Sequence, residues 1–264
     1  MRRQFFLAPL CALALSGPAL AADLGPPPPP IPVFTWTGIY VGGQIGFAWE
    51  QNVTIPSVSA IDPFGDYFFA TFSKGGPQGV IGGAHVGYNY QFSQWVVGLE
   101  GSVDGTGLQR TFFGTVTDIF GNDLGAVNAF TRSEIQGSIR GRFGIAFDHS
   151  LLYATGGVAF AGFNASITDT TGFFTGFPGL TASSSTTRAG WTVGGGIEYA
   201  ITDNWSVRGE YRYSSFGNLT SSSFPGLAAP LVVTSRFQLR ENQVQAGFSY
   251  KFDTFAPAPI IAKY

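Results

Sequence analysis

Charged side chains in this sequence recur at every second position of otherwise apolar segments. Arg140 and Arg142 alternate with Ile139 and Phe143, and the segment 205–213 repeats this pattern with acids and bases mixed. Opposite charges on one face of a strand can form ion pairs or line a path for ions. The residues predicted to share such a face are Glu100, Arg140, Arg142, Glu198, Arg208, Glu210, Arg212 and Lys251.

The direction of this charged face follows from the cost of placing charge in lipid. One Arg or Lys on the lipid side of a membrane strand costs about 2–4 kcal/mol near the midplane. Several such residues together would exceed the whole stability of a typical fold, about 5–15 kcal/mol. If these segments cross a membrane, the charged face therefore points inward.

The elements that carry these charges are predicted to be strands, because apolar and polar residues alternate with a period of two. The segment 134–147 is the clearest case. The segment 151–162 is weaker, since either of its faces could pass for apolar. The eight predicted strands are 36–49, 78–92, 95–104, 134–147, 151–162, 188–201, 205–213 and 242–252.

The connections between the predicted strands alternate strictly in length. Short turns at 93–94, 148–150 and 202–204 alternate with segments of roughly 25 residues that are rich in Gly, Ser, Thr, Pro and Phe. Outer-membrane barrels have short periplasmic turns and longer extracellular loops. A soluble barrel of the lipocalin type would instead place its apolar residues inside. We therefore expect an all-β fold, an eight-stranded antiparallel transmembrane β-barrel with periplasmic termini and four long extracellular loops.

Composition agrees with this expectation. Only 11% of residues are charged, 16% are aromatic, and the chain has 37 glycines. Beyond the first 22 residues no stretch of about 18 apolar residues is present that could form a membrane helix. A β-barrel reconciles the high apolar content with the lack of such a helix. Apolar and polar residues alternate along each strand, so the mean hydropathy of consecutive residues stays low.

The two ends are expected to lie outside the barrel. Residues 1–21 resemble a signal peptide, with Arg2 and Arg3 before an apolar stretch and Ala19-Leu20-Ala21 as the cleavage pattern. Its removal leaves 12 basic and 16 acidic residues, a balance that argues against a nucleic-acid partner. The predicted domains are a signal peptide at 1–21, a Pro-rich periplasmic segment at 22–35, the barrel at 36–252 and a tail at 253–264.

Aromatic residues near the predicted strand ends fit the girdles of membrane barrels. These rings would lie at the two lipid–water interfaces, and substrate stacking is a poorer explanation for them. The predicted girdle comprises Trp36, Trp49, Trp95, Trp191, Trp205 and Phe252.

Several motifs resemble those of a known family. The segments are 36–43 (WTGIYVGG) after the Pro-rich stretch, 137–144 (GSIRGRFG), 152–159 (LYATGGVA) and the ending 245–252. They resemble small alphaproteobacterial outer-membrane β-barrels of the opacity type, similar to the OmpA transmembrane domain. The resemblance implies the barrel fold, and the ending resembles the signal read by the barrel-insertion machinery. Some members of such families are linked to hemin binding, which makes a loop-bound ligand one hypothesis.

Other chemistry finds little support in the sequence. His85 is predicted to point into the barrel and His149 to lie in a turn, and neither has a second His or Cys nearby. The strand glycines, such as Gly194 and Gly196, lack the Gly-Lys-Ser/Thr of a phosphate-binding loop. No catalytic triad stands out. We expect no enzyme activity, no metal and no cofactor.

Two roles remain open for the inward charges. A barrel of eight strands is too narrow for an open channel, and buried charges must be paired, so a salt-bridged plug is the favoured interpretation. Rearrangement of the pairs to open a narrow ion path is the alternative. The expected function is a structural, surface-exposed barrel supporting envelope integrity and surface contact. The alternatives are a narrow non-specific porin, and hemin or other ligand binding by the loops.

The expected partners follow from this function. They are outer-membrane lipid, the insertion machinery and an extracellular ligand or host surface. Four segments predicted as loops, 62–69, 110–120, 173–177 and 224–231, are rich in aromatic residues for exposed chain. Exposed apolar patches often mark binding sites. The alternative is that these residues pack among themselves or extend the strands above the membrane.

Overall fold

A computed structural model describes residues 34–50, 58–61, 67–172, 178–179, 181–221 and 235–252. The predicted signal peptide, most of the Pro-rich segment and the predicted tail lie outside the described residues. So do the loop segments 173–177 and 224–231 and residues 62–66.

Every element of the described chain is a β-strand or a connection between strands. The eleven strands are β1 Gly38–Glu50, β2 Val58–Ile61, β3 Tyr67–Phe72, β4 Gln78–Phe92, β5 Trp95–Thr106, β6 Gln109–Thr117, β7 Asp123–Phe147, β8 Ser150–Asp169, β9 Thr181–Ala200, β10 Trp205–Ser221 and β11 Ser235–Lys251. Among the first five strands, β1, β4 and β5 are barrel strands and the short β2 and β3 are not.

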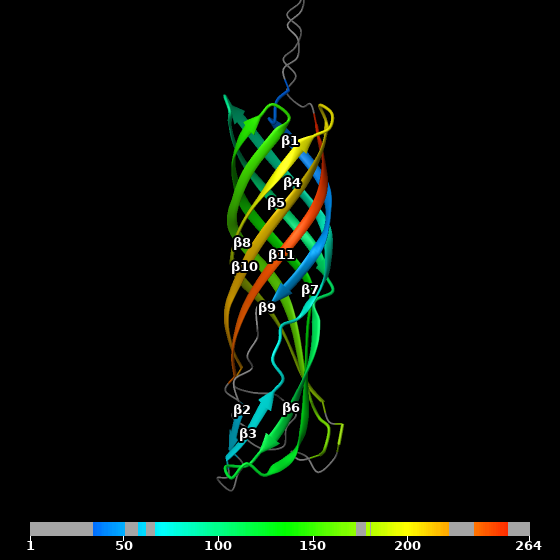
Figure 1. Cartoon of the computed structure of the whole chain (residues 1–264), viewed down its shortest axis with the longest axis vertical. Coiled ribbons are helices and arrows are strands. Elements are labelled where there is room, and N and C mark those ends of the chain that lie inside the picture. Colours follow the sequence, from blue (N-terminus) through cyan, green and yellow to red (C-terminus); the bar gives the residue numbers. More distant parts are fainter. Residues whose placement is uncertain are drawn as a thin grey trace, which may run out of the picture. The chain divides into compact units, whose positions relative to one another are not determined.

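Eight of these strands close into a ring. Antiparallel pairing runs β1–β4–β5–β7–β8–β9–β10–β11, and β11 pairs back onto β1. The strands wind obliquely around a common axis (Figure 1). All eight predicted strands fall within this ring, so the prediction of an eight-stranded antiparallel barrel is confirmed.

The two faces of the ring are inverted relative to a soluble protein. Large apolar side chains cover the outer face, as with Ile45, Leu99 and Ile197, which are 64%, 60% and 60% exposed. The inner face holds buried Gln, Ser, Glu and Arg side chains. Such an arrangement is stable only when hydrocarbon surrounds the outer face.

A search of the described residues for membrane-crossing helices finds none of sufficient length and apolar character.

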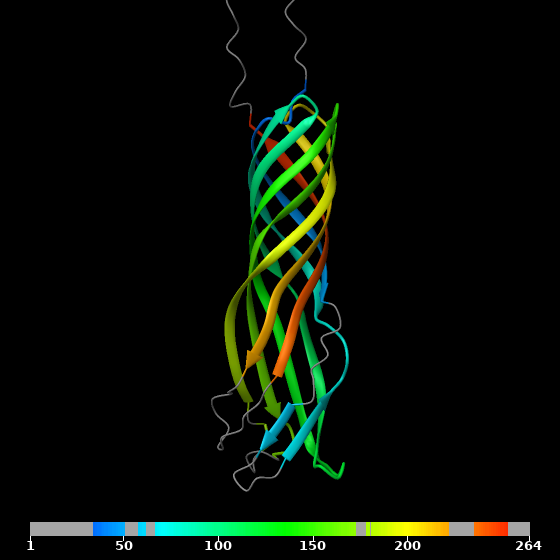
Figure 2. The ribbon, with the colours of Figure 1, turned by 90° about the vertical axis from the view of Figure 1, so that its left-hand side faces the viewer.

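Tight turns join the barrel strands at one end, which we call the turn end. Ser93 and Asp148 adopt positive φ angles of 56° and 52° there, as tight reversals between strands often require. The strands β2, β3 and β6, which belong to the long connections, lie at the opposite end, which we call the loop end (Figures 1 and 2).

The long connections contain more regular structure than the sequence indicates. β7 begins at Asp123, eleven residues before its predicted start, and β8 continues to Asp169. β6 pairs with the added part of β7, and β3 and β2 extend this sheet. The added segments mix apolar, polar and small residues without a sustained alternation, so their pattern does not distinguish a strand from a loop.

A β-bulge marks the point where β7 leaves the ring. Ser133 pairs with Phe163 and Gln136 with Ala161, so Glu134 and Ile135 together face Gly162 of β8. On its other side β7 exchanges β5 for β6 as its partner at this level. Bulges bend a strand and re-aim its side chains, and here the bend separates the barrel from the sheet beyond it.

Apolar clusters lie toward both ends of the barrel interior. The turn-end cluster consists of Trp36, Val96, Ala146, Leu151, Tyr153 and Ala200. Toward the loop end, Ala48, Ile81 and Leu108 form one cluster. Ala159, Ala161, Phe216 and Leu239 form another.

Small residues on the inner face make room for the larger side chains of neighbouring strands. A Cβ added to Gly42 would lie 2.0 Å from the carbonyl oxygen of Phe248 and 2.5 Å from Nε2 of His85. On the outward face of β5, a Cβ at Gly101 would meet nothing closer than 3.9 Å. Gly42 is therefore required by close approach, whereas Gly101 is not.

We expect Gly42→Ala to destabilise the barrel by about 1–3 kcal/mol, because the added methyl group overlaps backbone that cannot move freely. Urea unfolding from lipid vesicles, followed by tryptophan fluorescence, measures the change. Gly101→Ala is the matched control and should differ little from the natural protein. Equal stability of the two variants would contradict the close packing of this wall.

Candidate functional site

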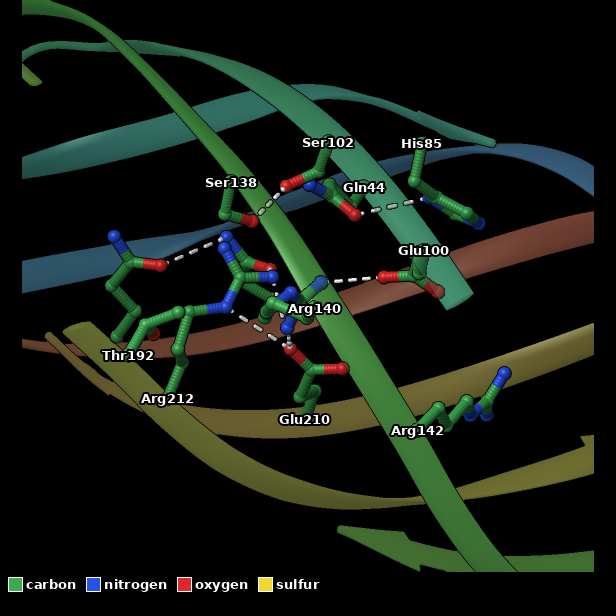
Figure 3. A network of polar contacts seen from close by, with 12 residues as sticks. Gln44, His85, Glu100, Ser102, Ser138, Arg140, Arg142, Thr192, Glu210 and Arg212 are labelled. Carbon is green, nitrogen blue, oxygen red and sulfur yellow. Dashed lines mark hydrogen bonds and ion pairs between the residues drawn. The ribbon is translucent and has the colours of Figure 1, made fainter. Parts of the chain in front are cut away.

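The barrel interior contains a network of ion pairs centred on Arg140 of β7. Its guanidinium donates to Glu100 on β5 and to Glu210 on β10, and its side chain is fully buried (Figure 3). Glu100 also accepts hydrogen bonds from Arg208, at 2.6 Å, and from the Tyr40 hydroxyl, at 2.8 Å. One arginine thus bridges opposite walls of the lumen.

Glu210 forms the second centre of the network. It accepts from Arg140, from Arg212 at 2.9 Å and from the Tyr153 hydroxyl at 3.0 Å. Arg212 also lies 3.6 Å from Asp104 on β5. Each carboxylate therefore has at least two donors, which is the condition for keeping a buried charge ionised.

A neighbouring pair lies closer to the turn end. Arg142 donates to Glu198 on β9, and the Ser206 hydroxyl donates to the same carboxylate at 2.5 Å. The guanidinium stacks over the Tyr153 ring, 3.7 Å from its centroid. This contact offsets part of the loss of water around the arginine.

Seven of the eight residues predicted for the charged face meet in these pairs, and Lys251 does not. The Lys251 ammonium donates to the backbone carbonyl of Thr35 and lies over the Phe34 ring at the turn end. It lies near the end of β11 and lines the same turn-end hollow as Glu198. These contacts of Lys251 therefore lie at the turn end, away from the ion pairs centred on Arg140.

Polar residues that were not singled out in the sequence complete the interior. Gln44 donates to Asp104 and accepts from Arg208 at 2.7 Å. Gln136 donates to Glu241 at 2.5 Å and accepts from Gln243 at 2.8 Å. Their inward placement was readable from the alternation, but the cross-lumen partners were not.

His85 is part of this hydrogen-bonded interior. One ring nitrogen, Nδ1, lies 3.0 Å from Gln44 Oε1, and the other, Nε2, lies 3.0 Å from the Ser249 hydroxyl. The side chain is buried. Among the described residues no group of three or more His, Cys, Asp or Glu is arranged to hold a metal ion.

Acids outnumber bases in the interior. The buried inward carboxylates of the ring are Glu50, Glu100, Asp104, Glu198, Glu210 and Glu241, whereas the buried inward arginines are Arg140, Arg142, Arg208 and Arg212. The surplus lies toward the loop end, where Glu50 and Glu241 face each other across β1 and β11. Like charges directly opposite each other on a sheet are destabilising.

The predicted girdle residues lie on the outer face, with one exception. Trp191 and Trp205 are exposed, Trp49 and Trp95 are half-buried, and Phe252 is exposed. Trp36 is buried, packs edge-on to Phe34 and belongs to the turn-end cluster. The expectation that Trp36 faces lipid was wrong, because Trp36 has the same parity as Tyr40 and continues the inward face of β1.

The sheet beyond the loop end has its own apolar interior. Phe72, Phe112, Val116 and Val127 pack together on one of its faces. On the other side Phe113 is exposed, and Phe120 at the β6–β7 turn is 82% exposed. Some aromatic residues of the predicted loops therefore pack among themselves, and others are exposed.

The β6–β7 turn is held by one carboxylate. Asp118 accepts hydrogen bonds from the backbone amides of Phe120 and Asn122 and from the Asn122 side chain, at 2.7–2.8 Å. The Asn122 side-chain bond is the main cause that lowers the pKa of Asp118 from its usual value. The turn therefore presents Ile119 and Phe120 to solvent in a fixed conformation.

The family of the chain follows from its match to a family model. The outer membrane protein beta-barrel domain matches residues 7–252. The chain belongs to this family. Its location is therefore the outer membrane, with the turn end in the periplasm and the loop end outside the cell.

Named relatives agree with this assignment. A 31 kDa outer-membrane immunogenic protein of Brucella melitensis is 27% identical over 95% of this chain and 100% of its own length. A 22 kDa outer membrane protein of Rhizobium leguminosarum is 28% identical over 84% of this chain and 80% of its own. Among solved structures, Neisserial surface protein A covers 82% of this chain and 98% of its own, at 15% identity and a TM-score of 0.42.

We expect Glu210→Ala to destabilise the barrel by about 3–5 kcal/mol, because Arg140 and Arg212 lose a buried counter-charge. Refolding and urea unfolding in lipid vesicles measure the change. The control is Glu134→Ala, which removes a half-exposed partner of Arg132 and should cost under about 1 kcal/mol. A loss below about 1 kcal/mol for Glu210→Ala would refute the paired interior.

The excess of carboxylates over arginines predicts that removing one of these acids stabilises the barrel. Glu50→Gln should raise the free energy of unfolding by about 0.2–1 kcal/mol at alkaline pH, where both carboxylates are ionised, because it removes a like charge facing Glu241. Glu241→Gln is the contrasting variant, since Glu241 accepts hydrogen bonds from Gln136 and Gln243 that an amide cannot fully replace. Destabilisation by Glu50→Gln would show that this carboxylate is stabilised as an anion.

Proposed function

We propose that this protein is a structural, surface-exposed barrel whose lumen is closed by its charge network, and that it supports envelope integrity and contact at the cell surface. The observation that carries the proposal is the position of the Arg140 side chain. It is fully buried and forms ion pairs with Glu100 and Glu210 on different walls of the barrel. A side chain tied to both walls occupies the axis along which an ion would have to pass.

The surroundings of Arg140 support closure along the whole barrel. Apolar clusters cover the charge network toward both ends. The hollow lined by Trp36, Tyr40 and Asn89 at the periplasmic end has room for only about 20 Å³, which is the space of roughly one water molecule. Conduction would require ion pairs to break and apolar residues to separate.

A narrow non-specific porin is the alternative function. It would use the same residues, with Arg140 or Arg212 exchanging carboxylate partners so that a thin polar path opens. Arg212 already contacts both Glu210 and Asp104, which gives such an exchange a starting point. The two functions differ in one measurable property, the steady conductance of the folded barrel.

Hemin capture rests on the family resemblance alone. Both ring nitrogens of His85 lie within hydrogen-bond distance of polar partners inside the barrel, so this histidine does not favour hemin as a ligand. Loop residues other than His85 would have to provide the binding site.

The proposal assigns no catalytic role. The buried carboxylates are held by arginines and tyrosines and lie beneath apolar clusters, where no substrate could reach them. For surface contact, the exposed apolar residues of the β6–β7 turn are the candidate contact points. For assembly, the proposed partner is the barrel-insertion machinery, which would read the end of β11.

We expect the refolded protein to give no steady current in a planar lipid bilayer, because the charge network fills the lumen. Arg140→Ala combined with Glu210→Ala removes one base and one acid, and with them three buried ion pairs, without changing net charge. It should produce small, resolvable current steps. The control pair, Arg132→Ala with Glu134→Ala, removes a surface ion pair and should stay silent.

Steady conductance of the natural protein would overturn the closed-lumen proposal and favour the porin. If the Arg140 and Glu210 double variant gave no current, the apolar clusters and not the charges would close the lumen.

A further inference from the structure

An open trough runs along the outer face of β8, just beyond the outer aromatic girdle. Two adjoining hollows of about 370 and 300 Å³ form it, and both are lined by Glu134, Asn164 and Ser185. Ligand sites typically have volumes of about 300–1,000 Å³. The trough is therefore large enough for a bound molecule.

The β-bulge of β7 creates this trough. Glu134 and Ile135 bulge out on one side, and the hydroxyl residues of β9 stand on the other. Gly162 lies opposite the bulge and has no side chain to fill the bottom of the trough. A Cβ there would meet nothing closer than 3.9 Å. Neither the bulge nor the trough is needed to close the barrel.

The lining changes from apolar to polar along the trough. Its inner end has Phe160 and Ile135, which continue the lipid-facing surface of the barrel. Its outer end has Asn164, Ser183 and Ser185, together with the half-exposed guanidinium of Arg132. An occupant would need an apolar part directed toward the bilayer and a hydroxyl-rich part directed away from it.

The outer end offers hydrogen-bonding groups that suit a saccharide. Within the part of the chain that the structure describes, the Asn164 amide and the hydroxyls of Ser183 and Ser185 form no hydrogen bond to other side chains. Arg132 is held 3.3 Å from Glu134 and can add a donor for a sugar or phosphate oxygen. Phe130 supplies an aromatic wall beside them.

We propose that this trough binds the saccharide headgroup of a glycolipid of the outer leaflet, one molecule per barrel. The acyl chains would lie on the apolar surface below Phe160. The sugar would lie between the bulge of β7 and the Ser-rich part of β9. Continuity with the lipid-facing surface favours a membrane glycolipid over a soluble glycan.

The test uses the full-length mature barrel, refolded in detergent and titrated with a purified phosphorylated, acylated disaccharide lipid. Native mass spectrometry counts bound molecules. We expect one retained glycolipid in the natural protein and about tenfold weaker binding in Gly162→Phe, because the ring fills the trough floor. The control is Gly156→Phe, on the same strand and the same face but within the hydrocarbon band, where a Cβ has 4.0 Å of clearance.

A second variant tests the proposal in case Gly162→Phe does not fold. Asn164→Val leaves the floor open but removes the amide, and it should weaken binding without altering the heat-modifiable gel mobility of the barrel. The same titration with the deacylated saccharide and with an anionic phospholipid distinguishes the source of the ligand.

Three results would overturn the proposal. The first is equal binding by the natural protein and Gly162→Phe. The second is an equal loss in Gly156→Phe, which would indicate general adsorption to the lipid face. The third is binding of the free saccharide as tight as that of the glycolipid, which would indicate a soluble ligand.

Discussion

The structure depends on the separation of charge from hydrocarbon across a wall one strand thick. Outward side chains such as Ile45 and Leu99 meet lipid, while Arg140 and its carboxylate partners are enclosed. A membrane cannot accept these charges, and the barrel is too narrow to hydrate them. Pairing inside the lumen is therefore the condition on which the rest of the fold is built.

This condition explains the neighbours of the charges as well. Tyr40 and Tyr153 reach into the lumen to donate hydrogen bonds to Glu100 and Glu210, and glycines on adjacent strands leave room for their rings. A Cβ at Gly87 would lie 2.4 Å from the Tyr40 hydroxyl. The abundance of glycine thus reflects the space that large polar side chains need inside a small barrel.

Beyond the membrane the same strands serve a different purpose. Past the bulge at Glu134 and Ile135, β7 pairs with β6 and supports a sheet with its own apolar cluster around Phe112. The barrel anchors this sheet, and the bulge sets where the anchored part ends. The exposed turn at Phe120 and the trough on β8 both lie in this outer part, where ligands and lipid headgroups can be reached.

The sequence by itself determined the eight strands, their faces and the inward direction of seven charged residues, because alternation with a period of two is a local property. Only the tertiary structure decided that Arg140 meets Glu210, 70 residues away, since that contact depends on the register of strands that are not neighbours in the ring. The same holds for the contacts that Lys251 makes with Thr35 and that Trp36 makes in the turn-end cluster, since both join segments far apart in the sequence. Long-range pairing also extended β7 and β8 beyond their predicted bounds, through segments whose local pattern does not indicate a strand.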